Sequence, residues 1–146
     1  MSPRGKRFDQ RLAKKWTTLP GVIILCGRFE GIDERILEHY DIEEVSLGDF
    51  VMTGGEIAAQ AMIDATVRLL PNVLGNPESP LDESHSSGLL EYPQYTKPNE
   101  WKGQEIPEIL LSGHHENIAK WRMENAKTKT QKNRPDLWKA HNKVKD

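Results

Sequence analysis

The segment Val22–Cys26 is continuously apolar, rich in β-branched residues, and has glycine on both sides. Such a run predicts a strand that is buried on both faces, because a strand with one wet face alternates apolar and polar residues. A strand of this kind needs neighbouring strands and covering helices. The sequence therefore predicts a parallel α/β layer.

Helical and extended patterns alternate around this strand. The expected elements are helices over Phe8–Trp16, over Asp33–Tyr40 and from Thr53 to before Pro71, with further strands at 43–47 and 50–52. Thr53 and Glu56 have the spacing of a capping box, which predicts that the third helix begins there. Two or three strands are too few for a free-standing sheet. We therefore expect the sheet to be completed by another chain or by strands that this sequence lacks.

Three glycine-bearing turns each follow an apolar segment, at 27–31, 46–50 and 53–56. Ligands of parallel sheets bind beyond the carboxyl ends of the strands, where glycine lets the backbone approach a ligand closely. The same glycines also suit ordinary turns and helix caps. The turns match neither a P-loop nor a G-x-G-x-x-G fingerprint, so phosphate or dinucleotide binding is not indicated.

The charge is distributed unevenly along the chain, although the net charge is only -2. Residues 1–15 carry six basic and one acidic side chain, and residues 113–146 carry nine basic and four acidic ones. The middle segment carries five basic and seventeen acidic side chains. Basic ends favour a polyanionic partner, but they are equally typical of solvated tails.

The single cysteine, Cys26, excludes internal disulfides and cysteine-cluster metal sites, and it fits a reducing cytoplasm. Apolar residues make up only 36% of the chain, and no apolar run approaches the length of a membrane span. We therefore expect a cytoplasmic protein with a modest core and no membrane partner.

A polar stretch rich in Pro, Ser and Gly lies between residues 72 and 98, and we place a domain boundary within 75–90. Asp82 and Glu83 fall in this stretch, where a carboxylate could act as a general base or could simply be solvated. Arg68 lies near the end of the preceding helix. It could hold an anionic group or could serve as a helix-terminal cation.

The sequence of the last third of the chain predicts basic helices. His114, His115 and Glu116 lack the spacing of a zinc-binding helix, so no metal site is expected. The turn before His115 suits an RNA phosphate, and Lys120 and Arg122 would extend that surface. The neighbouring Trp121 fits either a stacking role or the core.

Taken together, these segments resemble one family closely, the bacterial tRNA (guanine-N1)-methyltransferases of the knotted SPOUT superfamily. The resemblance rests on these motifs: Ser2-Pro3-x-Gly5, residues 25–35, residues 46–56, residues 89–98, and Leu110-Leu111-Ser112-Gly113-x-His115-x-x-Ile118-x-x-Trp121-Arg122. The motifs are long, keep their order and cover nearly the whole chain.

The resemblance implies a trefoil-knotted parallel α/β domain followed by a small helical RNA-binding domain, and this knot is an exception to the usual unknotted topologies. The implied division is a cofactor-binding region at 1–75, a linker at 76–90 and a helical tRNA-binding domain at 91–146. The implied activity is methyl transfer from S-adenosylmethionine to N1 of the guanosine immediately 3′ of the tRNA anticodon. The implied enzyme is a homodimer with active sites at its interface.

The resemblance also assigns roles to residues. Cofactor contacts are implied for Ser2, Pro3, Gly27, Glu30, Gly31, Ser46, Leu47, Gly48, Asp49, Phe50, Val51, Met52, Gly54 and Gly55. Arg68 matches the catalytic arginine, which would orient guanine O6. The catalytic aspartate falls on Glu83 by register and on Asp82 by residue type, and we favour Asp82. RNA contacts are implied for His115, Lys120 and Arg122.

Ser2-Pro3-x-Gly5 lies well inside the catalytic domain of this family. The resemblance therefore implies that roughly the first third of a full-length enzyme, including the opening strands, is absent here. This leaves an alternative function for the chain, a non-catalytic tRNA-binding fragment whose cofactor site is incomplete.

Overall fold

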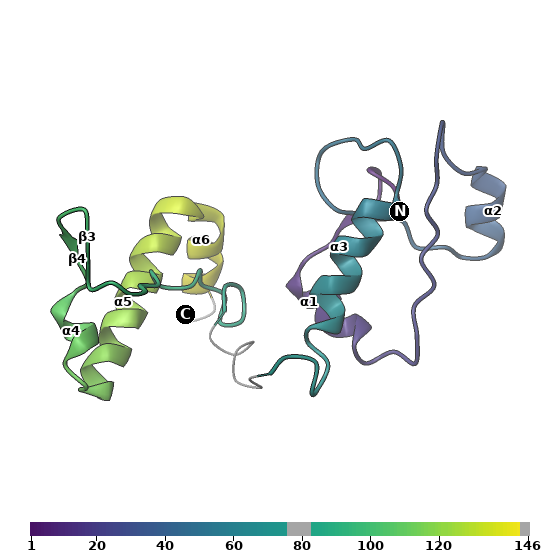
Figure 1. Ribbon diagram of the computed structural model, residues 1–146. Helices are drawn as coiled ribbons and strands as arrows, with labels where there is room; N and C mark the ends of the chain where they lie inside the picture. The colour runs from purple at the N-terminus through teal and green to yellow at the C-terminus, as the bar shows by residue number, and fades with distance from the viewer. Residues whose placement is uncertain (76–82, 144–146) are drawn as a thin grey trace. The chain divides into compact units, whose positions relative to one another are not determined.

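The computed structural model describes residues 1–75 and 83–143. Two compact units divide the chain, Met1–Pro77 and Glu78–Asp146. Each unit has helices and one small sheet. The helices of both units are labelled in Figure 1. The described helices include none that is both long enough and apolar enough to cross a membrane.

The first unit contains a short parallel β-ladder and three helices. In chain order these are β1 (Lys6–Arg7), α1 (Gln10–Trp16), α2 (Glu34–His39), β2 (Val45–Ser46) and α3 (Glu56–Val67). Strands β1 and β2 pair in parallel, with Lys6 opposite Val45 and Arg7 opposite Ser46. The structure therefore confirms a small parallel sheet with helices.

Helices α1 and α3 pack against each other and form the core of this unit. Ala13 of α1 and Met62 of α3 are fully buried, and Ala58 and Ala59 are nearly so. Asp9 caps α1 by accepting a hydrogen bond from the Leu12 amide at 2.9 Å. Small side chains at the contact let the two helices approach closely, and burial of the apolar side chains between them stabilises the unit.

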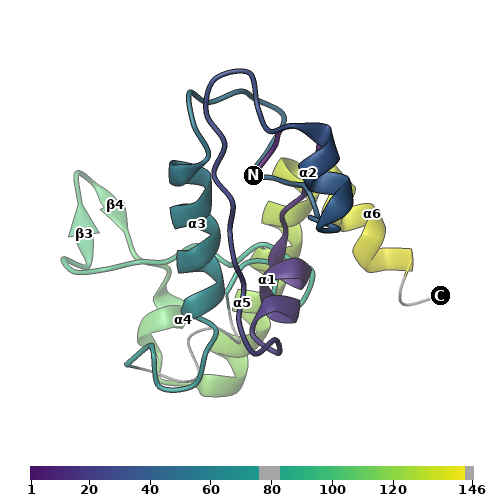
Figure 2. The same cartoon turned by 90° about the vertical axis from the view of Figure 1, so that its right-hand side faces the viewer.

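The prediction of a strand at Val22–Cys26 is wrong for this chain. The segment is extended but belongs to no strand (Figure 2), and the Ile23 side chain is fully exposed. Within the described residues, the only sheet partners in this unit are the two residues each of β1 and β2. An apolar segment cannot form a ladder without a neighbouring strand, because its amides and carbonyls then have nothing to pair with.

The helix predicted from Thr53 is present, but it begins at Glu56 with Gly55 as its N-cap and without a side-chain cap. The Gly55 amide instead donates to the Gly27 carbonyl at 3.3 Å. This contact ties the turn before α3 to Gly27. Thr53 precedes the N-cap and lies outside the helix.

The second unit contains a hairpin and three helices. These are β3 (Glu100–Trp101), β4 (Gln104–Glu105), α4 (Glu108–Leu111), α5 (His115–Asn133) and α6 (Pro135–Lys143). Helix α5 packs against both α4 and α6. The fully buried Thr130 of α5 accepts a hydrogen bond from the Leu90 amide at 2.8 Å, which holds the entering chain against the helix.

Candidate functional site

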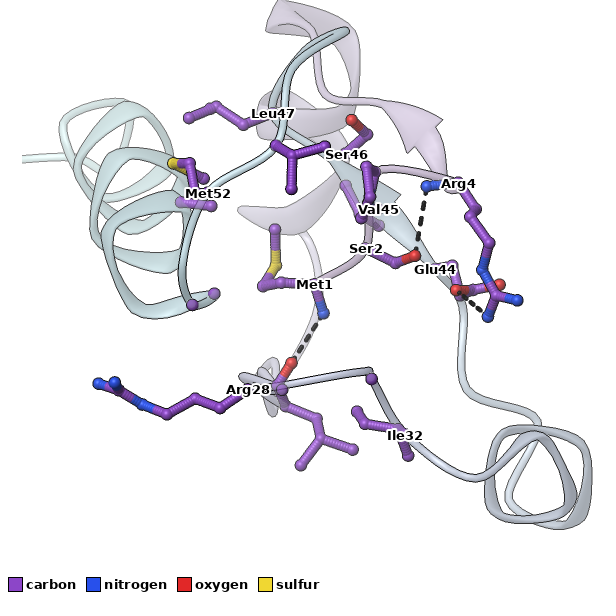
Figure 3. Close-up of a pocket in the computed structure, with 18 of the residues that line it drawn as sticks. Met1, Ser2, Arg4, Arg28, Ile32, Glu44, Val45, Ser46, Leu47 and Met52 are labelled. Atoms are coloured by element: carbon purple, nitrogen blue, oxygen red, sulfur yellow. Dashed lines mark hydrogen bonds and ion pairs between the residues drawn. The ribbon is translucent and has the colours of Figure 1, made fainter.

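The first unit contains a cavity of about 410 Å³. Its walls come from three separate parts of the chain: the N-terminal residues 1–4, the loop around residues 27–32, and the segment 42–55. Figure 3 shows lining side chains from each of these parts. Cavities that hold small molecules usually measure about 300–1,000 Å³, so the size suits a ligand of that class.

The structure brings the expected cofactor residues together. The residues that line the cavity include Ser2, Pro3, Gly27, Glu30, Gly31, Ser46, Leu47, Gly48, Phe50, Val51, Met52, Gly54 and Gly55. Asp49 is the one expected residue outside the lining, and its exposed carboxylate lies 4.0 Å from Arg7 Nη1. Asp49 sits at the outer side of its turn and faces solvent.

The N-terminal segment is held against β2 by backbone hydrogen bonds. The Ser2 amide donates to the Val45 carbonyl at 3.0 Å, and the Lys6 amide donates to the Glu44 carbonyl at 3.1 Å. The Met1 ammonium donates to the Leu25 carbonyl at 2.7 Å. This segment therefore joins the walls formed by β2 and by the residues before Gly27.

A charged cluster includes two of the lining residues, Arg4 and Glu44. The Arg4 guanidinium contacts Glu44 at 2.9 Å and Glu34 at 3.2 Å (Figure 3 shows the Glu44 contact). Hydrogen bonds from the Ser2 and Arg4 side chains lower the pKa of Glu44, and the two carboxylates raise the pKa of Arg4. The cluster keeps these groups ionised and links the N-terminal segment to α2 and β2.

The loop 27–31 has an unusual backbone. Phe29 adopts a left-handed conformation with φ of 57°, and Gly31 has φ of 117°. Left-handed geometry is costly for an aromatic residue, and such strain is concentrated at functional sites. The Phe29 side chain is fully exposed.

The turn after β2 is closed by its own side chains. Ser46 is buried, and its hydroxyl both accepts from the Gly48 amide at 3.2 Å and donates to the Gly48 carbonyl at 2.9 Å. A Cβ at Gly48 would lie 2.6 Å from the Phe50 ring, so a larger residue there would displace that ring. Phe50 and Val51 are exposed at the cavity.

Arg68, the expected catalytic residue of the first unit, does not line the cavity. Arg68 is the half-buried C-cap of α3 in the first unit. Glu83 is half-buried and belongs to the second unit. Asp82 lies outside the described residues.

The expected RNA-contacting residues all lie on α5 and are exposed. His115 begins the helix, and Lys120 pairs with Glu116 at 2.8 Å. The Arg122 guanidinium lies over the Tyr92 ring, 4.8 Å from its centroid, which orients the cation. Trp121 is half-buried, with its ring 6.3 Å from that of Tyr95.

The reasoning from sequence missed several lining residues. Met1, Arg4, Arg28, Ile32 and Val45 all line the cavity. Arg28 and Ile32 lie within a motif that was recognised, so proximity to its glycines was an available signal. No pattern in the sequence indicated Met1, whose role depends on the fold. The described residues contain no group of three or more His, Cys, Asp or Glu that could hold a metal ion.

The chain is similar to a known family over nearly its whole length. The family model for tRNA (guanine-1)-methyltransferase TrmD matches residues 1–140. A tRNA (guanine-N(1)-)-methyltransferase from Ruegeria pomeroyi is 63% identical over all 146 residues, which cover 60% of that relative. The corresponding protein from Clostridium beijerinckii is 58% identical over 139 residues, which are 95% of this chain and 58% of the relative.

The chain thus spans about 60% of the length of these curated relatives. Both the length of the family match and the identities are far above what chance similarity gives. The chain belongs to the tRNA (guanine-1)-methyltransferase family.

Proposed function

We propose that this chain carries the cofactor site and the RNA-binding surface of an S-adenosylmethionine-dependent tRNA methyltransferase. The product is N1-methylguanosine immediately 3′ of the anticodon. One observation carries the proposal: all the expected cofactor residues except Asp49, drawn from three distant segments, line a single cavity. The family membership supports the chemistry.

The lining suits S-adenosylmethionine in size and in chemistry. The cavity of about 410 Å³ combines apolar side chains with the polar backbone of three glycine turns. A Cβ at Gly55 would lie 2.9 Å from Met1 Cβ and 3.1 Å from Cys26 Cα, so these walls meet only around a glycine. When bound, the sulfonium supplies an already activated methyl group.

The two sides of the cavity would hold different parts of the cofactor. The backbone of residues 47–52 would present amides and carbonyls to the adenine edge, with Leu47, Phe50 and Met52 as apolar contacts. Glu30 would lie near the cationic methionyl end, because a carboxylate favours an ammonium group. The protein's task is then alignment of the methyl group with its acceptor.

Arg68 and a carboxylate from the 82–83 pair would act on the guanine. N1 of guanine carries a proton at neutral pH, and its lone pair becomes available only when that proton leaves. The Asp82 or Glu83 carboxylate would accept the proton. The Arg68 guanidinium would donate to O6, where negative charge develops as the proton leaves.

The second unit would bind the anticodon region of tRNA through α5. His115, Lys120 and Arg122 are exposed on this helix, and the segment 113–146 has more basic than acidic side chains. Contacts of this kind bind phosphates and weaken as salt rises. The Arg122 guanidinium, which lies over the Tyr92 ring, would offer a flat face on which an unstacked base could stack.

The proposal includes the assembly of the whole enzyme. It comprises a trefoil-knotted sheet, a homodimer with the active site at its interface, and a cytoplasmic location, where tRNA is modified. The side chains of Val22, Ile23 and Leu25 are exposed. Their exposure supports further strands or a second subunit that would cover them in the whole enzyme. The same exposure also favours the second candidate, a tRNA-binding fragment that cannot hold the cofactor.

Labelled-methyl transfer to anticodon stem-loops tests the function. The substrate carries guanosine 3′ of the anticodon, and the matched control carries adenosine there. Label on the first RNA alone is the expected result. If the chain binds both stem-loops but neither transfers label nor binds the cofactor, the result favours the tRNA-binding fragment. Label on both RNAs would contradict N1 of that guanosine as the methyl acceptor.

A further inference from the structure

Two loops that line the cavity cross each other with little backbone support. Arg28 and Gly54 form an isolated antiparallel bridge, and the Gly55 amide donates to the Gly27 carbonyl at 3.3 Å. Within the described residues, neither loop belongs to a β-sheet that would extend this bridge. The relative position of the two loops therefore depends on side chains.

One ion pair spans the crossing. Arg28 Nε lies 2.8 Å from Glu56 Oε1. Glu56 is the first residue of α3, where the helix dipole favours an acid. Hydrogen bonds from its own backbone and from Arg28 lower the pKa of Glu56. The pair is therefore ionised at neutral pH.

The pair occupies the space next to Gly54 in which a side chain would lie. A Cβ at Gly54 would collide with the Glu56 carboxylate and would lie 3.6 Å from Arg28 Cγ. Figure 3 shows the Arg28 side chain extending away from Ile32. Arg28 is part of the cavity lining and Glu56 is not, so the pair links the cavity wall to the first turn of α3.

The loop 27–31, which contains Arg28, has a backbone conformation that needs support from its surroundings. The next residue, Phe29, is left-handed, and its exposed ring makes no packing contact that would hold this conformation. A strained segment persists only when its surroundings enforce it. Glu30 and Gly31 follow directly and line the cavity.

We propose that Arg28 and Glu56 form a positioning pair that fixes the 27–31 loop against the 53–55 turn and thereby sets the affinity for the cofactor. Neither side chain needs to touch the reacting atoms. The inference rests on the proposed function, because the ligand is taken to be S-adenosylmethionine.

A double-mutant cycle tests the pair on the purified full chain, with Arg28→Ala, Glu56→Gln and the double variant. Arg11→Ala is the matched control, because the Arg11–Asp9 pair is also exposed, at 3.0 Å, but lies outside the cavity. Calorimetric titration with S-adenosylmethionine gives the affinity. Amide exchange at Gly55 without cofactor reports the crossing itself.

We expect each single variant to bind about two- to fivefold more weakly, as the loss of a partly exposed ion pair allows. The double variant should bind no more weakly than the singles, and Arg28→Lys should recover part of the loss. Gly55 exchange should quicken in all three variants but not in Arg11→Ala. In a turnover assay, KM for the cofactor should rise while kcat stays unchanged.

Equal affinity in the wild type, Arg28→Ala and Arg11→Ala would overturn this inference alone. Additive losses in the double variant would also overturn it, because the two residues would then act separately. A folded wild-type chain that fails to bind S-adenosylmethionine would overturn the proposed function and this inference with it.

Discussion

Gly5 offers a sharp test of how the cavity wall is built. It immediately precedes β1, and a Cβ there would overlap the Glu44 carbonyl group and the Val45 nitrogen. Backbone atoms of a paired strand cannot move aside as a flexible side chain can. The change Gly5→Ala should therefore push β1 away from β2.

The magnitude follows from the hydrogen bonds at this contact. Separation of the strands threatens the bonds from Ser2, Lys6 and Phe8 to β2 and its preceding residue, at 3.0, 3.1 and 2.8 Å. At about 1 kcal/mol each, their loss would cost about 3 kcal/mol of the free energy of unfolding. For a small unit this corresponds to a fall in Tm of at least about 12 °C.

Thermal unfolding followed by circular dichroism measures the effect, and amide exchange at Lys6 locates it in β1. Gly21→Ala is the matched control, because a Cβ there meets nothing within 4 Å and the residue does not have a positive φ. The control should be unchanged or slightly more stable, by up to about 1 kcal/mol. Equal stability of the two variants would refute the close contact between Gly5 and β2.

Three further predictions concern other parts of the chain. Thr130→Val should cost about 1–3 kcal/mol in urea unfolding, because it leaves the Leu90 amide without its acceptor; an unchanged midpoint would contradict this role. The hydrogen bond from Arg134 lowers the pKa of Asp136 from 3.8 to about 2. The ionised Asp136 carboxylate therefore stabilises the folded state fully above pH 3.8, and this stabilisation is lost as pH falls to about 2. Asp136→Asn should flatten this acid transition of helicity, whereas an identical transition would show that the pair has no effect. Arg68→Ala should abolish methyl transfer while leaving the cofactor affinity intact, and loss of both would remove its assigned role.

The segments that line the cavity were easier to recognise in the sequence than the pairing of the sheet. Apolar content at Val22–Cys26 indicates a preference for burial, but a strand also needs a partner, and the pattern of one segment cannot supply it. The exposed Ile23 shows the difference. The helices were easier to predict, because their hydrogen bonds are local; Asp9 and Asp33 each cap a helix by accepting from a backbone amide.

Glycine turns could be recognised from the sequence, because glycine is frequent in turns and at helix ends. Their meeting around one cavity could not, because it depends on contacts between residues far apart in the chain. The Met1 ammonium on the Leu25 carbonyl is such a contact, and so is the Arg28–Glu56 pair. The left-handed Phe29 was equally hidden, because an aromatic residue gives no signal for that geometry.

Hydrogen exchange with and without saturating S-adenosylmethionine tests the central claim most directly, which is that three separate segments form one cofactor site. We predict simultaneous protection of amides in residues 2–5, 27–31 and 46–55, and no change along α5. Protection of only one segment, or no protection in a chain shown to be folded, would contradict the claim.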